Sequence, residues 1–157
     1  MDKPNKVFSP KEAKLKAASY CAYQERTQQQ VRDKLYSYGL WEEAVEEILT
    51  ALILDNFINE ERFAKSFVSG KFRIKKWGRR KILMRLKQFH LSPYCVKKGM
   101  EEIDPEEYQQ TLEGLIVKKV AVTTETDIFK RNGKIARYLV GKGYEEGLIW
   151  ETIKSMK

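Results

Sequence analysis

The amino-acid sequence predicts an all-α protein made of three tandem three-helix repeats. Two observations point to helices: residues that cap helix ends recur along the chain, and the segments between them carry apolar side chains at helical spacing. A third observation, one apolar pattern that recurs at fixed offsets, points to repeats. Strand signals are poor, because the β-branched cluster at 117–124 follows Leu112, Leu115 and Ile116, whose spacing is helical.

Helix starts are the best-marked features of the sequence. Ser9-Pro10-Lys11-Glu12 offers a side-chain cap, a proline at the first helical position and a carboxylate that reaches back to the cap. Related capping chemistry occurs at four further starts: Thr27–Gln30, Asn59-Glu60-Glu61, Ser92-Pro93 and Asp104-Pro105. Helices are therefore predicted over residues 10–25, 28–38, 41–55, 60–74, 78–90, 93–102, 105–121, 127–142 and 144–156.

Comparison of the chain with itself reveals the repeat. An offset of 51 residues aligns Val31, Leu35, Tyr38 and Leu40 with Ile82, Leu86, Phe89 and Leu91, and an offset of 104 aligns Val31, Leu35, Gly39 and Leu40 with Ile135, Leu139, Gly143 and Tyr144. Chance matches between amphipathic helices are the alternative. A single unit of this size buries too little apolar surface to be stable alone, so tandem units are expected to share faces in a curved array. The predicted boundaries are a tail over 1–8 and repeats over 9–57, 58–103 and 104–157.

Charge is unevenly distributed along the chain. The formal net charge is +8, yet residues 62–100 hold 13 Lys and Arg and no Asp or Glu, so the remainder of the chain is net negative. A solvated surface usually mixes both signs of charge. The middle repeat is therefore expected to present a positive face to nucleic acid or to an acidic protein, with an ordinary solvated surface as the alternative.

The turn Lys75–Lys81 concentrates this charge around one aromatic residue, Trp77. Two interpretations of Trp77 stay open: an anchor that holds the turn, or an exposed platform on which a base stacks. We expect Arg79 and Arg80 to be exposed. The candidate binding residues are Lys71, Arg73, Lys75, Lys76, Trp77, Arg79, Arg80, Lys81, Arg85 and Lys87.

Other functional classes find little support. A Cys–His pair of His90 and Cys95 is conceivable, but one histidine and two distant cysteines cannot build the usual zinc site, and no phosphate-binding glycine loop is present. No apolar run approaches the roughly 20 residues of a membrane span, and the N-terminus lacks the apolar core of a signal peptide. We expect a soluble cytoplasmic protein without catalytic residues, cofactor or metal.

The middle unit resembles the RecX family of bacterial recombination regulators. The resemblance is carried by Asn59-Glu60-Glu61-Arg62-Phe63-Ala64-Lys65-Ser66-Phe67-Val68, by Lys76-Trp77-Gly78-Arg79-Arg80-Lys81-Ile82, and by Leu86. Arg26-Thr27 followed by Val31, Lys34, Leu35 and Gly39 is similar to the first repeat of that family, and Ala136-Arg137-Tyr138-Leu139 with Gly143-Tyr144 to the last. His90 departs from the pattern, because the family often has a glycine there, and Asn59 or Glu60 replaces the usual Asp.

The resemblance implies an elongated, slightly curved helical molecule that binds the groove of the RecA–DNA filament. It also implies that the protein dampens ATP hydrolysis and strand exchange by this recombinase in DNA repair, or promotes filament disassembly, without catalytic residues of its own. The expected partners are the RecA filament and single- or double-stranded DNA, and the protein itself is expected to be a monomer. Three alternatives stay open: an autonomous DNA-binding protein with a helix-turn-helix, a helical scaffold for an acidic protein, and an enzyme.

Overall fold

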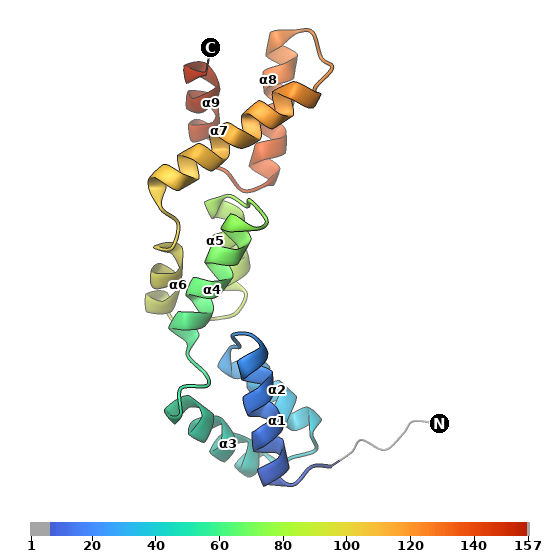
Figure 1. The fold of residues 1–157 in the computed structure, drawn as a ribbon, viewed down its shortest axis with the longest axis vertical. Coiled ribbons are helices and arrows are strands. Elements are labelled where there is room, and N and C mark those ends of the chain that lie inside the picture. The colour runs from blue at the N-terminus through green and yellow to red at the C-terminus, as the bar shows by residue number, and fades with distance from the viewer. Residues whose placement is uncertain (1–6, 157) are drawn as a thin grey trace, which may run out of the picture. The chain divides into compact units, whose positions relative to one another are not determined.

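The computed structural model describes residues 7–156, and over this range the chain forms nine α-helices and no strand (Figure 1). Their bounds are α1 Pro10–Tyr23, α2 Gln28–Ser37, α3 Glu42–Leu54, α4 Glu60–Arg73, α5 Arg79–Lys87, α6 Pro93–Met100, α7 Pro105–Val122, α8 Ile128–Gly141 and α9 Glu146–Ser155. The all-α prediction is confirmed, and every helix end lies within three residues of its predicted position. Most of the predicted tail, residues 1–6, and Lys157 lie outside the described residues.

The predicted caps form as the sequence indicates. The Ser9 and Asp104 side chains accept hydrogen bonds from the backbone N–H groups of Glu12 and Glu107, at 3.2 and 2.9 Å. Thr27 and Gln30 form a reciprocal capping box, in which each side chain accepts from the other residue's backbone N–H at 3.0 Å. These bonds satisfy donors that a helix start would otherwise leave unpaired, so local chemistry explains the accuracy of these boundaries.

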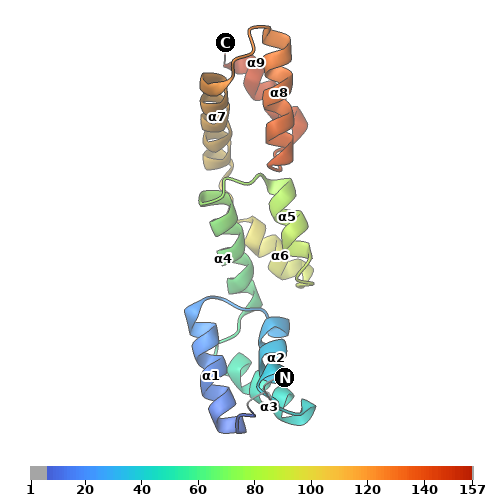
Figure 2. The ribbon, with the colours of Figure 1, turned by 90° about the vertical axis from the view of Figure 1, so that its right-hand side faces the viewer.

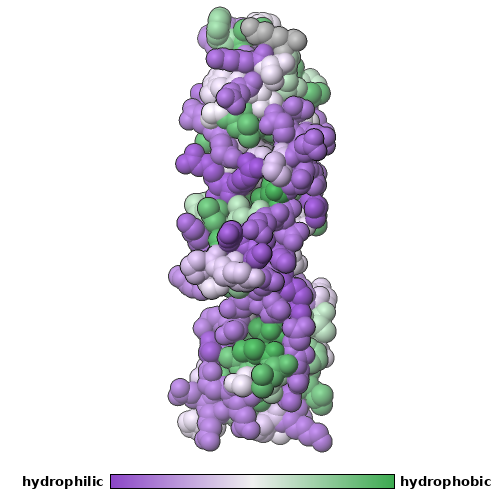
Figure 3. Space-filling view, turned by 90° about the vertical axis from the view of Figure 1, so that its left-hand side faces the viewer, coloured by the Kyte–Doolittle hydropathy of each residue, from purple (hydrophilic) through white to green (hydrophobic). Residues whose placement is uncertain are grey.

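The described chain divides into two compact units, the first ending at Phe63 and the second beginning at Ala64. In the first unit α1, α2 and α3 pack against one another around a core that includes Ala13, Val31, Leu35, Val45 and Leu52 (Figures 1 and 2). Space-filling shows hydrophobic side chains gathered in one area of this unit, in the lower part of the view (Figure 3). Exposed apolar residues of this unit include Leu54 and Trp41.

The second unit contains α5 to α9 and most of α4. At two places in this unit a glycine lets two segments of the chain pack closely together. Gly99 of α6 lies against Ala64 of α4, where a Cβ on the glycine would come within 2.9 Å of the alanine Cβ. Gly78, just before α5, lies against Gly143, just after α8, and a Cβ on Gly78 would lie only 2.3 Å from the Gly143 carbonyl carbon. Only glycine fits at Gly78, so the second and third repeats meet backbone to backbone.

The predicted repeat register is confirmed by burial. Val31 and Leu35, Ile82 and Leu86, and Ile135 and Leu139 are at most 1% exposed, so the same two positions of each repeat lie in the core. The equivalent Val45 and Ile149 are also fully buried, whereas Val96 is half-buried. Two phenylalanines lie one turn apart in α4: Phe63 is buried, and Phe67 is half-buried with its ring edge-on to that of Phe89.

The turn after the second helix of each repeat has a left-handed residue. Gly39, His90 and Gly143 occupy equivalent positions, and their φ angles are +85°, +55° and +101°. The turn is therefore conserved in shape across the repeats although His90 is not a glycine. A non-glycine residue in this conformation costs roughly 1–2 kcal/mol, which the surrounding packing must offset.

None of the helices over residues 7–156 is both long and apolar enough to cross a membrane.

Replacement of Leu86 by Ala should lower the free energy of unfolding by about 2–5 kcal/mol, because the leucine is fully buried and the change leaves a cavity in α5. The measurement is urea denaturation followed by circular dichroism. Met84→Ala on the same helix is the control, since Met84 is 57% exposed and its removal should change stability little. A loss for Leu86→Ala no larger than that for Met84→Ala would contradict the core assignment.

Gly78→Ala should destabilise the protein by about 1–3 kcal/mol, because the new Cβ would overlap the backbone of Gly143. Gly70→Ala is the matched control. It lies inside α4 with no atom within 4 Å of its would-be Cβ, so the higher helix propensity of alanine should stabilise the protein by about 1 kcal/mol. Opposite signs in urea denaturation are expected, and equal effects would show that the close approach is not tight.

Candidate nucleic-acid interface

The basic turn begins where α4 ends. The N–H of Lys76 donates to the carbonyl of Phe72 at 3.0 Å, and the N–H of Trp77 donates to that of Lys71 at 3.1 Å. This pair of bonds closes the helix, and it requires a left-handed residue at Lys76, whose φ is +59°. Trp77 follows the end of α4, and the next helix, α5, starts two residues later.

Three cations surround the indole ring of Trp77. The Lys81 Nζ lies 4.3 Å from the ring centroid, the Lys71 Nζ 5.0 Å and the Arg85 guanidinium carbon 5.9 Å. Lys81 and Arg85 follow Trp77 at intervals of four residues, which places them on one face of α5. The ring is half-buried and attracts these charges through its π electrons. This arrangement favours the interpretation of Trp77 as an anchor over that of a bare stacking platform.

Arg79 is not the exposed residue that the sequence suggested, and that expectation is wrong. The Arg79 side chain has two partners: its Nη1 lies 2.9 Å from Glu145 Oε2, and its guanidinium carbon lies 3.8 Å from the centroid of the Tyr108 ring. The backbone N–H of Arg79 also donates to the Tyr108 hydroxyl at 3.0 Å. The arginine is half-buried as a result. Its partners are contributed by the third repeat, 29 and 66 residues away in sequence, so no local pattern reveals them.

Tyr108 lies at the centre of the group of residues that holds Arg79 in place. It is buried, its ring lies 5.1 Å from that of Tyr144 and 5.8 Å from that of Phe72, and its hydroxyl donates to Glu145. Burial and the hydrogen bond to Glu145 raise the pKa of Tyr108, and burial likewise raises that of Tyr144. Both phenols therefore stay protonated and act as donors in the folded protein.

The loop between α8 and α9 closes the N-terminus of α5. The N–H groups of Gly78 and Arg80 donate to the carbonyls of Lys142 and Gly143 at 2.8 and 2.9 Å. In return the Tyr144 hydroxyl donates to the Lys76 carbonyl at 2.9 Å. Free N–H groups at a helix start can bind phosphate. Here those of Gly78 and Arg80 already donate to carbonyls of the protein, and that of Arg79 donates to the Tyr108 hydroxyl. The basic surface must therefore act through its side chains.

Seven of the nine predicted cations form no ion pair with a carboxylate among residues 7–156. Besides Arg79, the exception is Arg73, whose Nε lies 3.3 Å from Glu107 Oε1 of α7, where both side chains are substantially exposed. The unpaired cations comprise five exposed residues, Lys75, Lys76, Arg80, Arg85 and Lys87, and the half-buried Lys71 and Lys81. The structure thus gathers most of the predicted residues around the α4–α5 turn, and it assigns Arg79 and Trp77 to holding that turn in place.

Sequence reasoning missed the residues that position this surface. Tyr108, Glu145 and Tyr144 lie in the third repeat, outside the acid-free stretch that drew attention to the second. One signal was present: the repeat alignment places the phenol of Tyr144 where the first repeats have Leu40 and Leu91. An aromatic residue with a polar group in a core position usually has a hydrogen-bond partner.

The histidine and the cysteines considered for catalysis or metal binding lie in different surroundings. Over the described chain there is no group of three or more His, Cys, Asp and Glu side chains that could hold a metal ion. Cys21 is buried in the first unit, and this burial raises the pKa of its thiol, which favours the unreactive protonated form. Cys95 is half-buried and His90 exposed.

Comparisons with known proteins agree with this architecture. Residues 13–52, 59–100 and 106–153 match the first, second and third three-helix domains of RecX, respectively. The regulatory protein RecX of Clostridium botulinum is 33% identical over 131 residues, which cover 82% of this chain and 61% of the relative. That of Streptomyces lividans is 27% identical over 129 residues, covering 82% and 69%. The chain thus spans about three fifths of the length of the Clostridium relative.

Solved structures show the same fold. The crystal structure of RecX from Lactobacillus salivarius superimposes with a TM-score of 0.83, covering 94% of this chain and 96% of that chain at 22% identity. A second crystal structure of a regulatory protein RecX gives a TM-score of 0.78 at 24% identity. Three consecutive domain matches in the family's own order, together with these relatives, establish that the chain belongs to the RecX family of regulatory proteins.

Proposed function

We propose that this protein binds the filament that the RecA recombinase forms on DNA and lowers its ATP hydrolysis and strand exchange. The observation that carries the proposal is the group of seven cations around the α4–α5 turn, none of which pairs with a described carboxylate. Membership of a family of regulators supports the same conclusion. A surface with this excess of one charge would favour contact with the phosphates of DNA or with acidic protein groups.

The fixed geometry of the turn supports a binding role. Trp77 holds Lys71, Lys81 and Arg85 by cation–π contacts, and the third repeat holds the backbone of the turn through Gly78 and Arg80. Charges that are already in place lose less conformational freedom when a partner binds, so more of the interaction energy appears as affinity. In this proposal Lys75, Lys76, Arg80, Arg85 and Lys87 make the contacts.

Modulation of the recombinase requires no chemistry by this protein. A bound protein changes the activity of its partner when it binds one conformation of that partner more tightly than another. Binding to a filament conformation that hydrolyses ATP slowly would therefore be sufficient for inhibition. Such binding needs no metal ion, and residues 7–156 contain no group of three or more His, Cys, Asp and Glu side chains that could hold one.

The structure gives the alternative of an autonomous helix-turn-helix less support. A recognition helix usually presents its N-terminal residues to the base edges of the major groove. The N-terminus of α5 is instead closed by the carbonyls of Lys142 and Gly143 and by the Tyr108 hydroxyl. We therefore prefer a filament-binding role that uses the side chains along the turn and the exposed face of α5.

The native protein should inhibit ATP hydrolysis by the cognate recombinase on single-stranded DNA, and Lys75→Glu with Arg80→Glu should weaken this inhibition at least about tenfold. Both side chains are exposed and unpaired, so the double variant should fold normally. Arg79 is left unchanged because it holds the turn through Tyr108 and Glu145. The measurement is the concentration of protein that halves the steady-state ATPase rate.

A matched control separates local contact from net charge. Lys11→Glu with Lys14→Glu reverses the same number of charges at exposed positions of α1 in the first unit. This control variant should inhibit nearly as well as the native protein. Equal weakening by both pairs would remove the α4–α5 turn from the mechanism, and no inhibition by the native protein at concentrations matching the recombinase would refute the proposed function.

A further inference from the structure

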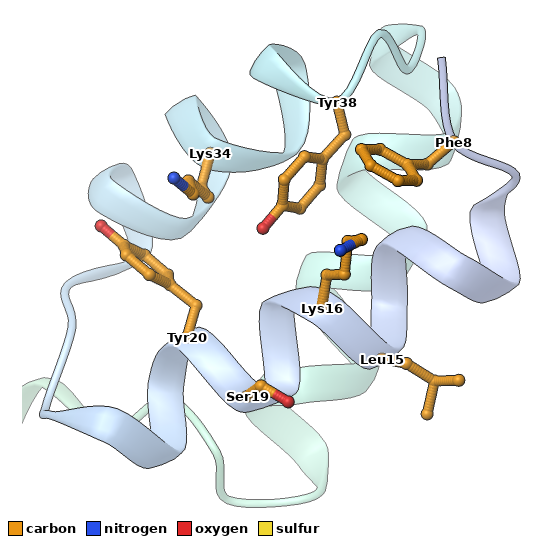
Figure 4. Close-up of a pocket in the computed structure, with 7 residues that line it drawn as sticks. All are labelled: Phe8, Leu15, Lys16, Ser19, Tyr20, Lys34 and Tyr38. Atoms are coloured by element: carbon orange, nitrogen blue, oxygen red, sulfur yellow. The ribbon is translucent and has the colours of Figure 1, made fainter. Parts of the chain in front are cut away.

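A second feature of the molecule lies in the first unit, whereas the α4–α5 turn belongs to the second. A hollow of about 600 Å³ opens between α1 and α2, and α1 contributes most of its wall (Figure 4). It is lined by Phe8, Leu15, Lys16, Ser19, Tyr20, Lys34 and Tyr38. Its volume falls in the range of about 300–1,000 Å³ that is usual for small-ligand sites. No carboxylate lines it.

The polar groups of this hollow can all donate hydrogen bonds. The Lys16 ammonium and the Tyr38 hydroxyl point into the space between the helices, and the Lys34 ammonium lies at the other end beside Tyr20 (Figure 4). Within the described chain neither lysine forms an ion pair. The hydroxyls of Tyr20, Tyr38 and Ser19 have no hydrogen-bond partner there. Ammonium groups have no acceptor capacity, so the ligand that suits them carries acceptors and negative charge.

Aromatic rings hold the cations at both ends of the hollow. The Lys16 Nζ lies 4.8 Å from the centroid of Phe8, whose ring meets that of Tyr38 edge to face at 5.3 Å. The N–H of Phe8 donates to the Tyr38 carbonyl at 3.0 Å, which fixes the start of the described chain against α2. At the other end the Lys34 Nζ lies 5.3 Å from the centroid of Tyr20, and the Arg26 guanidinium carbon lies 3.8 Å from it.

We infer that this hollow binds a nucleotide unit of single-stranded DNA, with the phosphate between Lys16 and Lys34 and the base against the tyrosine rings. A phosphodiester supplies only acceptors and a negative charge, which matches the two ammoniums. A base supplies the flat apolar face that a bare inorganic anion lacks, and alternating cations and aromatic rings are the usual composition of a single-strand site. The inference goes beyond the proposed function, because the binding that it describes requires neither the recombinase nor the α4–α5 turn of the second repeat.

The test measures binding of the full chain, without recombinase, to a fluorescein-labelled oligothymidylate by fluorescence anisotropy over a range of salt concentrations. Lys16→Gln with Lys34→Gln should weaken binding about tenfold and reduce the magnitude of the salt slope by about 1.4, since each lost contact to a single-strand phosphate removes about 0.7. Lys11→Gln with Lys14→Gln is the matched control on α1, because it removes the same charge outside the hollow. Its slope should equal that of the native protein.

A second readout locates the oligonucleotide. Photocrosslinking with an iodouracil-substituted strand, followed by peptide mapping, should yield an adduct at Tyr20 or Tyr38. Equal slopes for the two double variants, or adducts confined to other residues, would overturn the inference. Binding of inorganic pyrophosphate that needs both lysines, without oligonucleotide binding, would identify a free phosphate compound as the ligand and would also overturn it. Circular dichroism melting should show both variants folded, since the four lysines are exposed.

Discussion

The second unit depends on one backbone contact, the approach of Gly78 to Gly143. Because neither residue carries a side chain, the loop after α8 comes close enough for its carbonyls to accept from the N–H groups at the start of α5. A helix that begins with Gly78-Arg79-Arg80-Lys81 has no capping side chain and carries positive charge at the end where the helix dipole disfavours it. The third repeat supplies the missing acceptors, so the second repeat is completed by its neighbour.

Contacts with neighbouring side chains explain how so many like charges coexist in one turn. Glu145 pairs with Arg79 and accepts the Tyr108 hydrogen bond, Glu107 pairs with Arg73, and Trp77 provides the π surface that three other cations share. Only part of the charge is compensated in this way. The remaining cations project from a backbone that is held firmly, which is the arrangement that an anionic partner needs in order to bind without reordering the turn.

The sequence predicted the features that depend on local chemistry and left out those that depend on distant residues. Ser9, Thr27 and Asp104 mark helix starts because a cap and its partner lie three residues apart, and Leu35, Leu86 and Leu139 mark the core because helical periodicity is local. Arg79 was misjudged because its partners, Tyr108 and Glu145, are brought to it only by folding. The hollow lined by Lys16 and Lys34 was missed for the same reason, since its wall combines two helices with Phe8.

The protonation of the two buried phenols has a physiological consequence. Raised pKa values keep Tyr108 and Tyr144 neutral, so neither phenol adds negative charge beside the cations of the turn. None of the ten residues predicted for the surface is a histidine, the side chain that ordinarily titrates near neutrality. Salt screens exposed charges, so a rise in ionic strength would weaken the attraction of this surface for an anionic partner.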